Sequence, residues 1–266
     1  MNMRIKTGIA MYTVHHAVAK DISNTFVKLS AMGYQGVEFF GELEKFPEKQ
    51  VKGALQAGGL VITGWHLDWK RLQEGLFYKT VKHLLNCGCT MAVVQCLGGR
   101  WNVGHGPNGE CRDRWLYYAE WMNRVSEQLN REGLRLAYHN HEHEFALHYD
   151  GKTVYDLLYE NLSPEIVMEL DSGNCMEGGA HPAQVIEKYK ERPMILHLKP
   201  YSPKKGFEVV LGDSEDANDW KAILRSSGKQ FEWILVESEN TAMPEMENAG
   251  RCLTNLKTYL AQEADG

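Results

Sequence analysis

A regular alternation of short apolar runs and longer helical stretches is the feature that most limits how this chain can fold. Most of the apolar runs are apolar on both faces, which is typical of parallel strands that are buried on both sides. A repeated strand–helix order implies a parallel sheet with right-handed crossovers. The predicted strands are Lys6–Tyr12, Gly36–Phe40, Val61–His66, Met91–Gln95, Leu134–His141, Ile166–Asp171, Ile195–Lys199 and Trp233–Glu237.

The segments between these strands carry helical spacing and helix end signals. In the longest segment, Leu116, Met122 and Leu129 fall on one stripe, as in a helix that packs against a core. Glycines such as Gly33 and Gly133 follow the helices and stop them. The predicted helices are Asp21–Leu29, Pro47–Gly58, Leu72–Leu85, Arg112–Arg131, Thr153–Glu160, Pro182–Lys190, Trp220–Ser226 and Met246–Ala261.

The length fits eight such units in one domain. The 266 residues divide into units of about 33 residues, near the ~30 that a strand, a helix and the next strand need. No linker rich in glycine, proline or serine divides the chain, so we expect residues 1–266 to form a single (β/α)8 TIM barrel. The alternative, an open doubly wound sheet, calls for a glycine-rich phosphate turn after the first strand, and Met11–His16 has none.

Composition excludes several functional classes. The chain is 43% hydrophobic and 24% charged, which is ordinary for a globular protein. Its 29 basic and 35 acidic residues give a net charge of −6, which argues against nucleic acid as a partner. No stretch approaches the ~20 apolar residues of a membrane span, and the first residues do not resemble a signal peptide. We therefore expect a cytoplasmic protein with no membrane or nucleic-acid partner.

Polar side chains end four successive predicted strands. His139, Asp171, His197 and Glu237 follow the apolar parts of strands five to eight, and in barrels the reactive groups project from these carboxyl ends. Imidazole together with carboxylate suits a divalent ion such as Zn²⁺, Mn²⁺, Co²⁺ or Mg²⁺. The pattern therefore predicts a site for one divalent metal ion.

Side-chain parity narrows the choice on strand five. Alternate residues of a strand share a face, so Ala137, His139 and His141 form one set, and Leu136 and Tyr138 belong to the other. The bulky apolar set suits packing against the outer helices. We therefore expect the set with His139 and His141 to face the barrel interior, and either histidine remains a candidate for the metal ligand of this strand.

The ordered strand-end motifs resemble those of the xylose isomerase-like TIM barrels, the sugar phosphate isomerase/epimerase superfamily. The motifs are Tyr-His-Asn-His followed by Glu-Phe, Glu-Leu-Asp-Ser-Gly-Asn, Leu-His-Leu-Lys and Leu-Val-Glu-Ser-Glu. The resemblance implies a single divalent metal held by Glu, Asp, His and Glu from strands five to eight. Asp171, His197 and Glu237 match the last three of these ligands. His139 stands where the epimerases carry glutamate, and the inosose dehydratases also carry histidines here.

This resemblance implies a metal-dependent isomerase or epimerase that acts on a sugar or keto-sugar through an enediolate. The histidine on strand five weighs against the symmetric two-glutamate mechanism of the epimerases. It therefore gives more weight to the alternative, a lyase such as an inosose dehydratase or a keto-glycoside β-eliminating enzyme, while isomerisation or epimerisation stays the first choice. A non-catalytic sugar-binding barrel is a further alternative. An abasic-site endonuclease also belongs to the superfamily, but the net charge of −6 opposes DNA binding.

Candidate roles follow from the strand ends and the resemblance. We expect a small carbohydrate as the substrate, without phosphate, because Lys204-Lys205-Gly206 is the only basic loop near strands seven and eight. Homo-oligomers are common in the superfamily, and the sequence leaves the oligomeric state of this chain open. The candidate catalytic residues are His141, Glu144, Glu237 and Lys199. The candidate substrate-binding residues are His66, Glu38, Tyr12 and Trp101. The candidate metal ligands are His139, Asp171, His197 and Glu237.

Overall fold

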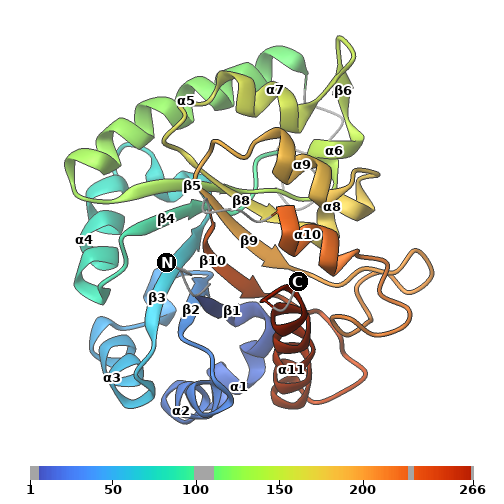
Figure 1. The fold of residues 1–266 in the computed structure, drawn as a ribbon. Coiled ribbons are helices and arrows are strands. Elements are labelled where there is room, and N and C mark those ends of the chain that lie inside the picture. The colour runs from blue at the N-terminus through green and yellow to red at the C-terminus, as the bar shows by residue number, and fades with distance from the viewer. Residues whose placement is uncertain (1–5, 99–110, 227–230, 265–266) are drawn as a thin grey trace.

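A computed structural model describes residues 6–98, 111–226 and 231–264 of the chain. Within these ranges, eight parallel strands close a barrel, and each strand pairs with its neighbours around the ring (Figure 1). The predicted (β/α)8 barrel is therefore confirmed. In spatial order the strands are β1 (Thr7–Ala10), β2 (Gly36–Phe40), β3 (Val61–Leu67), β4 (Met91–Val94), β5 (Arg135–His139), β8 (Val167–Asp171), β9 (Met194–Leu198) and β10 (Phe231–Val236).

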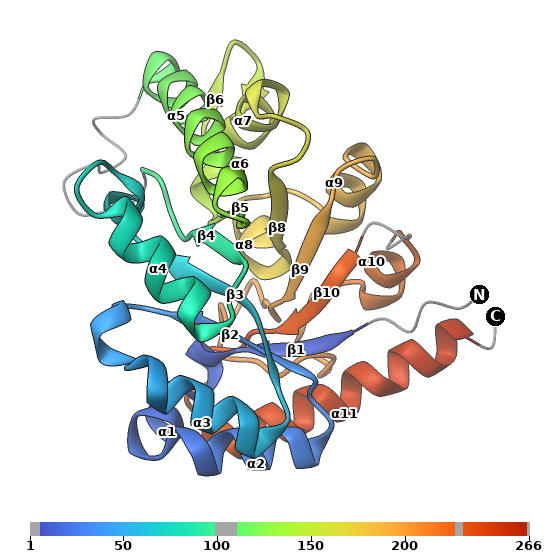
Figure 2. The same ribbon diagram turned by 90° about the vertical axis from the view of Figure 1, so that its left-hand side faces the viewer.

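Helices surround the barrel on its outside (Figures 1 and 2). The last helix lies beside the second one, so the two ends of the ring of helices meet. The helices are α1 (His15–Lys20), α2 (Ile22–Met32), α3 (Glu48–Gly58), α4 (Phe77–Cys87), α5 (Arg112–Arg131), α6 (His143–Ala146), α7 (Val154–Asn161), α8 (Ser172–Glu177), α9 (Pro182–Lys188), α10 (Trp220–Ser226) and α11 (Glu245–Ala264). A small antiparallel hairpin, β6 (His148–Tyr149) and β7 (Lys152–Thr153), precedes α7. Among the described helices, none combines the length and the apolar character that crossing a bilayer requires.

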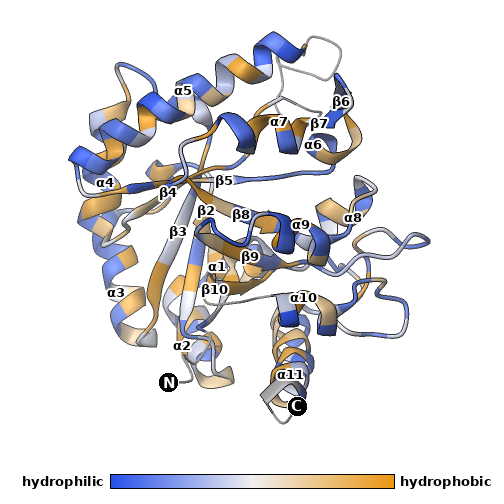
Figure 3. Ribbon diagram, turned by 45° about the horizontal axis from the view of Figure 1, so that its top comes forward, coloured by the Kyte–Doolittle hydropathy of each residue, from blue (hydrophilic) through white to orange (hydrophobic). Residues whose placement is uncertain are grey.

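Two apolar layers hold the fold together. The larger one lies between strands and helices and includes Leu136 and Tyr138 of β5. The helices alternate between hydrophobic and hydrophilic segments along their length (Figure 3), because each turns one face to the sheet. The smaller layer fills the barrel and includes Ala137. The parity prediction for strand five is therefore confirmed: Ala137 faces inward, and its bulky neighbours face the helices.

The floor of the barrel interior is unevenly filled. Its apolar members are Met91, Val93, Ala137, Val167, Ile195 and Leu235, with Trp233 packed against them. On β1, β2 and β3 the corresponding positions are glycines. A Cβ atom on Gly8 would lie 2.7 Å from Leu235 Cδ2, and one on Gly36 would lie 2.9 Å from the Trp233 ring. Large side chains from β10 thus occupy the space that these glycines leave.

Two predicted strands end two residues earlier than expected, and four others differ by one residue at this end. The first strand stops at Ala10, because Met11–Val14 forms a 3-10 helix. The fifth strand stops at His139, so His141 lies two residues beyond it. The sequence analysis also missed α1. Asp21 separates α1 from α2 by capping the second helix, where its side chain accepts a hydrogen bond from the backbone N–H of Asn24 at 3.0 Å.

Candidate metal centre and cavity

Polar side chains sit one step above the floor of the barrel. Because successive inward residues are two apart, the residue two positions after each floor residue also faces the interior. On six strands this residue is a histidine or a glutamate. The residues are Glu38 on β2, His66 on β3, His139 on β5, Glu169 on β8 and His197 on β9, with Glu237 directly after β10.

We define the outer cluster as His139, Asp171, His197 and Glu237. Each offers one ligand atom, and these atoms all lie within 4.8 Å of one another. His197 Nδ1 lies 2.6 Å from Glu237 Oε2. Asp171 Oδ2 is buried and accepts no hydrogen bond from the described residues. Mixed nitrogen and oxygen donors, with one buried carboxylate oxygen unsatisfied, fit a divalent ion.

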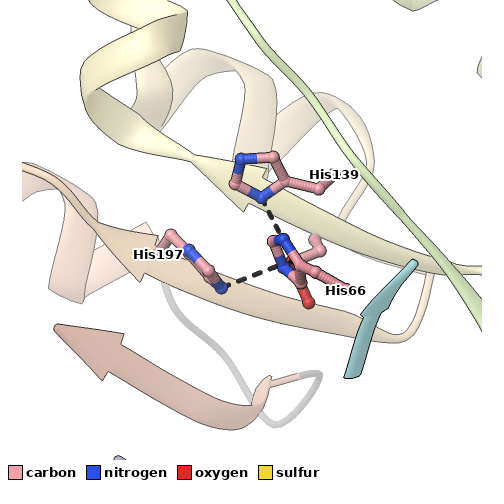
Figure 4. Close-up of side chains that lie close together, drawn as sticks. His66, His139 and His197 are labelled. Atoms are coloured by element: carbon pink, nitrogen blue, oxygen red, sulfur yellow. Dashed lines mark hydrogen bonds and ion pairs between the residues drawn. The ribbon is translucent and has the colours of Figure 1, made fainter. Parts of the chain in front are cut away.

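We define the inner cluster as Glu38, His66 and Glu169. His66 Nε2 lies 2.6 Å from Glu169 Oε1 and 3.1 Å from Glu38 Oε2. The inner cluster touches the outer one through two histidines: Glu169 Oε1 lies 3.0 Å from His139 Nδ1 and 3.4 Å from His197 Nε2. Figure 4 shows the rings of His66, His139 and His197 converging from three different strands.

The three histidines differ in the direction in which their surroundings shift the pKa. Burial lowers the pKa of an imidazole, and a nearby glutamate raises it. Burial would lower the pKa of His66, but the charges of Glu38 and Glu169 outweigh it and raise the pKa to about 10. Burial also opposes the charged form of His197, but the charges of Glu38 and Glu169 outweigh it and raise the pKa of His197 well above its usual value. For His139, burial dominates and lowers the pKa to about 3. Glu38 stays ionised, because His197 and His66 hold its pKa far below the usual value against the effect of burial.

Lys199 is a buried cation beside the outer cluster. Its Nζ lies 3.1 Å from Glu237 Oε1, 2.5 Å from Glu239 Oε1 and 4.0 Å from Asp171 Oδ2. Burial opposes the charge, but these carboxylates outweigh it and raise the pKa of Lys199 above its usual value. Burial raises the pKa of Asp171 to about 7. Lys199 is thus a permanent hydrogen-bond donor and positive charge at the mouth of the barrel.

A cavity of about 220 Å³ opens above the two clusters. Tyr12, Phe40 and Phe207 supply aromatic surface to its wall, and Lys199 Nζ lies 4.4 Å from the centre of the Phe207 ring. The cavity thus joins polar groups that can bind hydroxyls to apolar faces that can pack on a sugar ring. Its other charged or polar lining residues are Glu38, His66, Gln95, His139, His141, Asn174, Glu237 and Glu239.

The segment after β5 carries His141 into the cavity. Asn140 holds the end of β5 against β8, since its Oδ1 accepts a hydrogen bond from the backbone N–H of Asp171 at 3.0 Å. The side chain of His141 is part-buried, and its desolvation lowers its pKa well below the usual value. His141 therefore presents a neutral imidazole, the form that can accept a proton.

Glu144 lies beneath this segment instead of facing the cavity. It is fully buried, and its Oε1 accepts a hydrogen bond from the hydroxyl of Tyr138. Its Oε2 accepts a hydrogen bond from the backbone N–H of His141 at 2.9 Å. His143 Nε2 lies 3.2 Å from Glu144 Oε1. Through these contacts Glu144 holds the segment that carries His141, and its carboxylate does not face the cavity.

The structure brings most of the predicted site residues together. His139, Asp171, His197 and Glu237 form the outer cluster. Tyr12, Glu38, His66, His141 and Lys199 line the cavity with Glu237. Trp101 lies outside the described residues. The sequence analysis missed Glu169 and Glu239. Glu169 stands two residues before Asp171 in the same predicted strand, so the parity argument applied to strand five would have placed it on the inward face. Glu239 lies beyond the end of the eighth predicted strand, where parity gives no orientation.

Comparison with known proteins identifies the family of this barrel. The profile of the xylose isomerase-like TIM barrel family matches residues 26–259. An inosose dehydratase from Geobacillus kaustophilus is 25% identical over 187 residues, covering 65% of this chain and 59% of that protein. The chain thus spans less than two thirds of the length of that relative.

Solved structures share the fold. A sugar phosphate isomerase/epimerase from Parabacteroides distasonis has a TM-score of 0.77 and 20% identity, and the match covers 97% of both chains. The IOLI protein, solved with a bound zinc atom, has a TM-score of 0.68 and 12% identity, covering 97% of this chain and 99% of that one. The profile match spans most of the chain, and the closed barrel agrees with it. The chain therefore belongs to the xylose isomerase-like TIM barrel family.

Proposed function

We propose that this protein is a divalent-metal-dependent enzyme that removes a proton next to the carbonyl of a sugar or keto-polyol. The observation that carries the proposal is the outer cluster, which gathers His139, Asp171, His197 and Glu237 within 4.8 Å at the ends of four successive barrel strands. A cation bound there would act as a Lewis acid on substrate oxygens and stabilise the negative charge that develops when the proton leaves.

The charges around the cavity favour a neutral substrate. Glu38, Glu237 and Glu239 line it, and Lys199 is the only lysine or arginine among the described lining residues. Lys199 is already engaged by the carboxylates of Glu237 and Glu239. The Lys205 side chain, in the loop that was a candidate phosphate cradle, instead pairs with Glu215. A phosphate group would meet repulsion at this mouth, which supports a non-phosphorylated carbohydrate.

Two residues have the placement for proton transfer. His141 lines the cavity and carries a neutral imidazole, so it is the candidate general base that takes the proton from carbon. Lys199 donates hydrogen bonds at the same wall and would stabilise an oxyanion or protonate a departing hydroxyl. Glu144 would act indirectly, by holding the backbone of His141.

The sequence analysis favoured isomerisation or epimerisation over elimination. An epimerase that works symmetrically needs a base on each side of the abstracted carbon. Here the strand-five position is His139, whose Nδ1 is taken by Glu169 at 3.0 Å, so a second glutamate base is missing. The relative from Geobacillus kaustophilus is named for dehydration. These points favour dehydration of a keto-polyol, with isomerisation or epimerisation as the second candidate.

The test is to incubate the protein, loaded with Mn²⁺, Co²⁺ or Zn²⁺, in D₂O with ketoses, inososes and 3-keto-glycosides. We expect deuterium to enter the carbon next to the carbonyl of one substrate class. Loss of water in the product mass identifies a dehydratase, loss of the aglycone identifies a glycoside lyase, and an unchanged skeleton identifies an isomerase or epimerase.

The matched controls are the metal-free protein and the Asp171→Asn variant, and both should lose exchange. A panel without exchange in the loaded protein would contradict proton abstraction. Exchange that persists at full rate in the metal-free protein would contradict the role of the cation.

A further inference from the structure

Lys199 lies between a carboxylate of the outer cluster and a carboxylate outside it. Its Nζ lies 3.1 Å from Glu237 Oε1 and 2.5 Å from Glu239 Oε1. Glu237 belongs to the outer cluster, whereas Glu239 does not. A second member of that cluster is also near, because Asp171 Oδ2 lies 4.0 Å from the same ammonium group. A cation in the outer cluster would therefore have the charge of this lysine as an immediate neighbour.

The backbone after β10 presents both glutamates to this lysine. Ser238, which stands between them, is buried, and its backbone N–H donates a hydrogen bond to Thr13 Oγ1 at 2.9 Å. The Oγ of Ser238 accepts a hydrogen bond from Asn248 Nδ2 at 2.9 Å, which ties this residue to α11. The side chains on either side of Ser238 contact Lys199 instead. Glu239 thus follows a residue that is anchored both at the end of β1 and on α11.

Lys199 itself is held in place at both ends. Its backbone carbonyl accepts hydrogen bonds from Ser172 Oγ at 3.1 Å and from Asn218 Nδ2 at 3.2 Å. Its ammonium group lies 4.4 Å from the centre of the Phe207 ring, and the residue is only 3% exposed. A buried charge that loses its partner is strongly destabilising, so this ammonium group requires a carboxylate within reach.

The two oxygens of Glu237 face different neighbours. Its Oε2 lies 2.6 Å from His197 Nδ1, within the outer cluster, and its Oε1 faces Lys199. The carboxylate carries one negative charge, so a cation on one side and the ammonium group on the other would compete for it. Lys199 makes its shorter contact with Glu239, whose side chain is 33% exposed, against 9% for Glu237. The second carboxylate can thus balance the lysine while the first serves the cation.

We propose that Glu239 is a positioning residue that takes up the charge of Lys199 and so leaves the charge of Glu237 to a cation in the outer cluster. Glu239 acts through Lys199 and not as a ligand. This inference rests on the proposed function, because it requires a cation in the outer cluster. It deepens that function by explaining how a buried lysine and a divalent cation share one wall of the cavity.

The test is a double-mutant cycle on the affinity for Mn²⁺, measured by calorimetry on the full chain without substrate. The variants are Glu239→Gln, Lys199→Met and the two combined. Glu215→Gln is the matched control, because Glu215 also pairs with a lysine, Lys205, but neither residue lines the cavity. Thermal unfolding of each metal-free variant verifies that it is folded.

We expect Glu239→Gln to weaken Mn²⁺ binding by about tenfold, a typical size for the coupling between residues in contact. In the Lys199→Met background the same substitution should change the affinity by less than about threefold, because no lysine charge is left to balance. Glu215→Gln should bind Mn²⁺ like the wild type. An equal loss of affinity in both backgrounds overturns the proposal, since Glu239 would then act on the cation through its own charge. An unchanged affinity in Glu239→Gln overturns it as well.

Crystals of the wild type with Mn²⁺ in the outer cluster give a second measurement that needs no variant to fold. We expect Lys199 Nζ to stay within hydrogen-bonding distance of Glu239 while Glu237 binds the ion. An ammonium group that has left Glu239 overturns the proposal. A wild type that binds no Mn²⁺ overturns the proposed function together with this inference, whereas Mn²⁺ binding that does not depend on Glu239 through Lys199 overturns this inference alone.

Discussion

The carboxylate of Glu144 accepts a hydrogen bond from the backbone N–H of His141 at 2.9 Å, from below the segment that carries this histidine into the cavity. The same carboxylate accepts a hydrogen bond from Tyr138 and lies beside His143. A fully buried glutamate thus links the end of β5, the loop after it and the start of α6. The position of the candidate base depends on this link.

Replacing Glu144 with alanine should therefore affect stability and activity together. The change leaves Tyr138 and His143 buried without their partner, and breaking a buried charged pair costs about 3–5 kcal/mol. Urea unfolding of the metal-free protein measures this loss. Glu132→Gln, at an exposed position, should change the unfolding free energy by less than about 0.5 kcal/mol. A Glu144→Ala variant as stable as the wild type would contradict the supporting role.

His143 should make the stability of the protein depend on pH. Burial would lower its pKa, but Glu144 outweighs burial and raises the pKa to about 9. Since the folded state holds the proton more tightly than the unfolded state, the stabilisation is complete below pH ~6.5 and disappears as the pH rises through about 9. The unfolding free energy of the wild type should exceed that of His143→Asn by up to about 3 kcal/mol at pH ~6, and the gap should narrow toward pH ~10. A constant gap across this range would contradict the assignment.

Replacing His141 with asparagine should remove the candidate general base without removing a metal ligand. Loss of a positioned base lowers kcat by about 10²–10⁴. The bound metal, measured by elemental analysis, should stay at the wild-type level. A variant that loses metal in proportion to activity would make His141, and not His139, the strand-five ligand.

Replacing Lys199 with methionine should separate catalysis from metal binding. The ammonium group lies 3.1 Å from Glu237 Oε1, so it competes with a cation for the charge of this ligand. We expect tighter binding of Mn²⁺ by calorimetry, together with a loss of about 10²–10³ in kcat from the missing oxyanion donor. Lys221→Met, on the exposed face of α10, should change neither. Weaker metal binding in the Lys199 variant would contradict the competition.

The barrel and much of its chemistry were predictable from local pattern. The strand parity of β5 placed Ala137 and His139 on the inward face without any knowledge of their neighbours. Glu169 was missed because it lies inside an apolar run, and its partner His66 is 103 residues away in the sequence. Such a contact exists only once the barrel has closed.

Two further differences have the same origin. The fifth strand ends at His139 because Asn140 binds the backbone of β8, a long-range contact that no local pattern reports. Glu144 has the chemistry of a catalytic acid, and only its contacts with Tyr138 and the backbone of His141 reveal where it lies.

The glycines beneath the site set how deep its chemistry can lie. A Cβ atom on Gly64 would lie 2.9 Å from Glu38 Oε1, so a single methyl group at that position would displace this carboxylate. Trp233 and Leu235 already fill the space opposite Gly36 and Gly8. Two barrels with identical strand-end motifs but different side-chain volumes at these three positions would therefore hold their carboxylates in different places, and the motifs alone would not distinguish them.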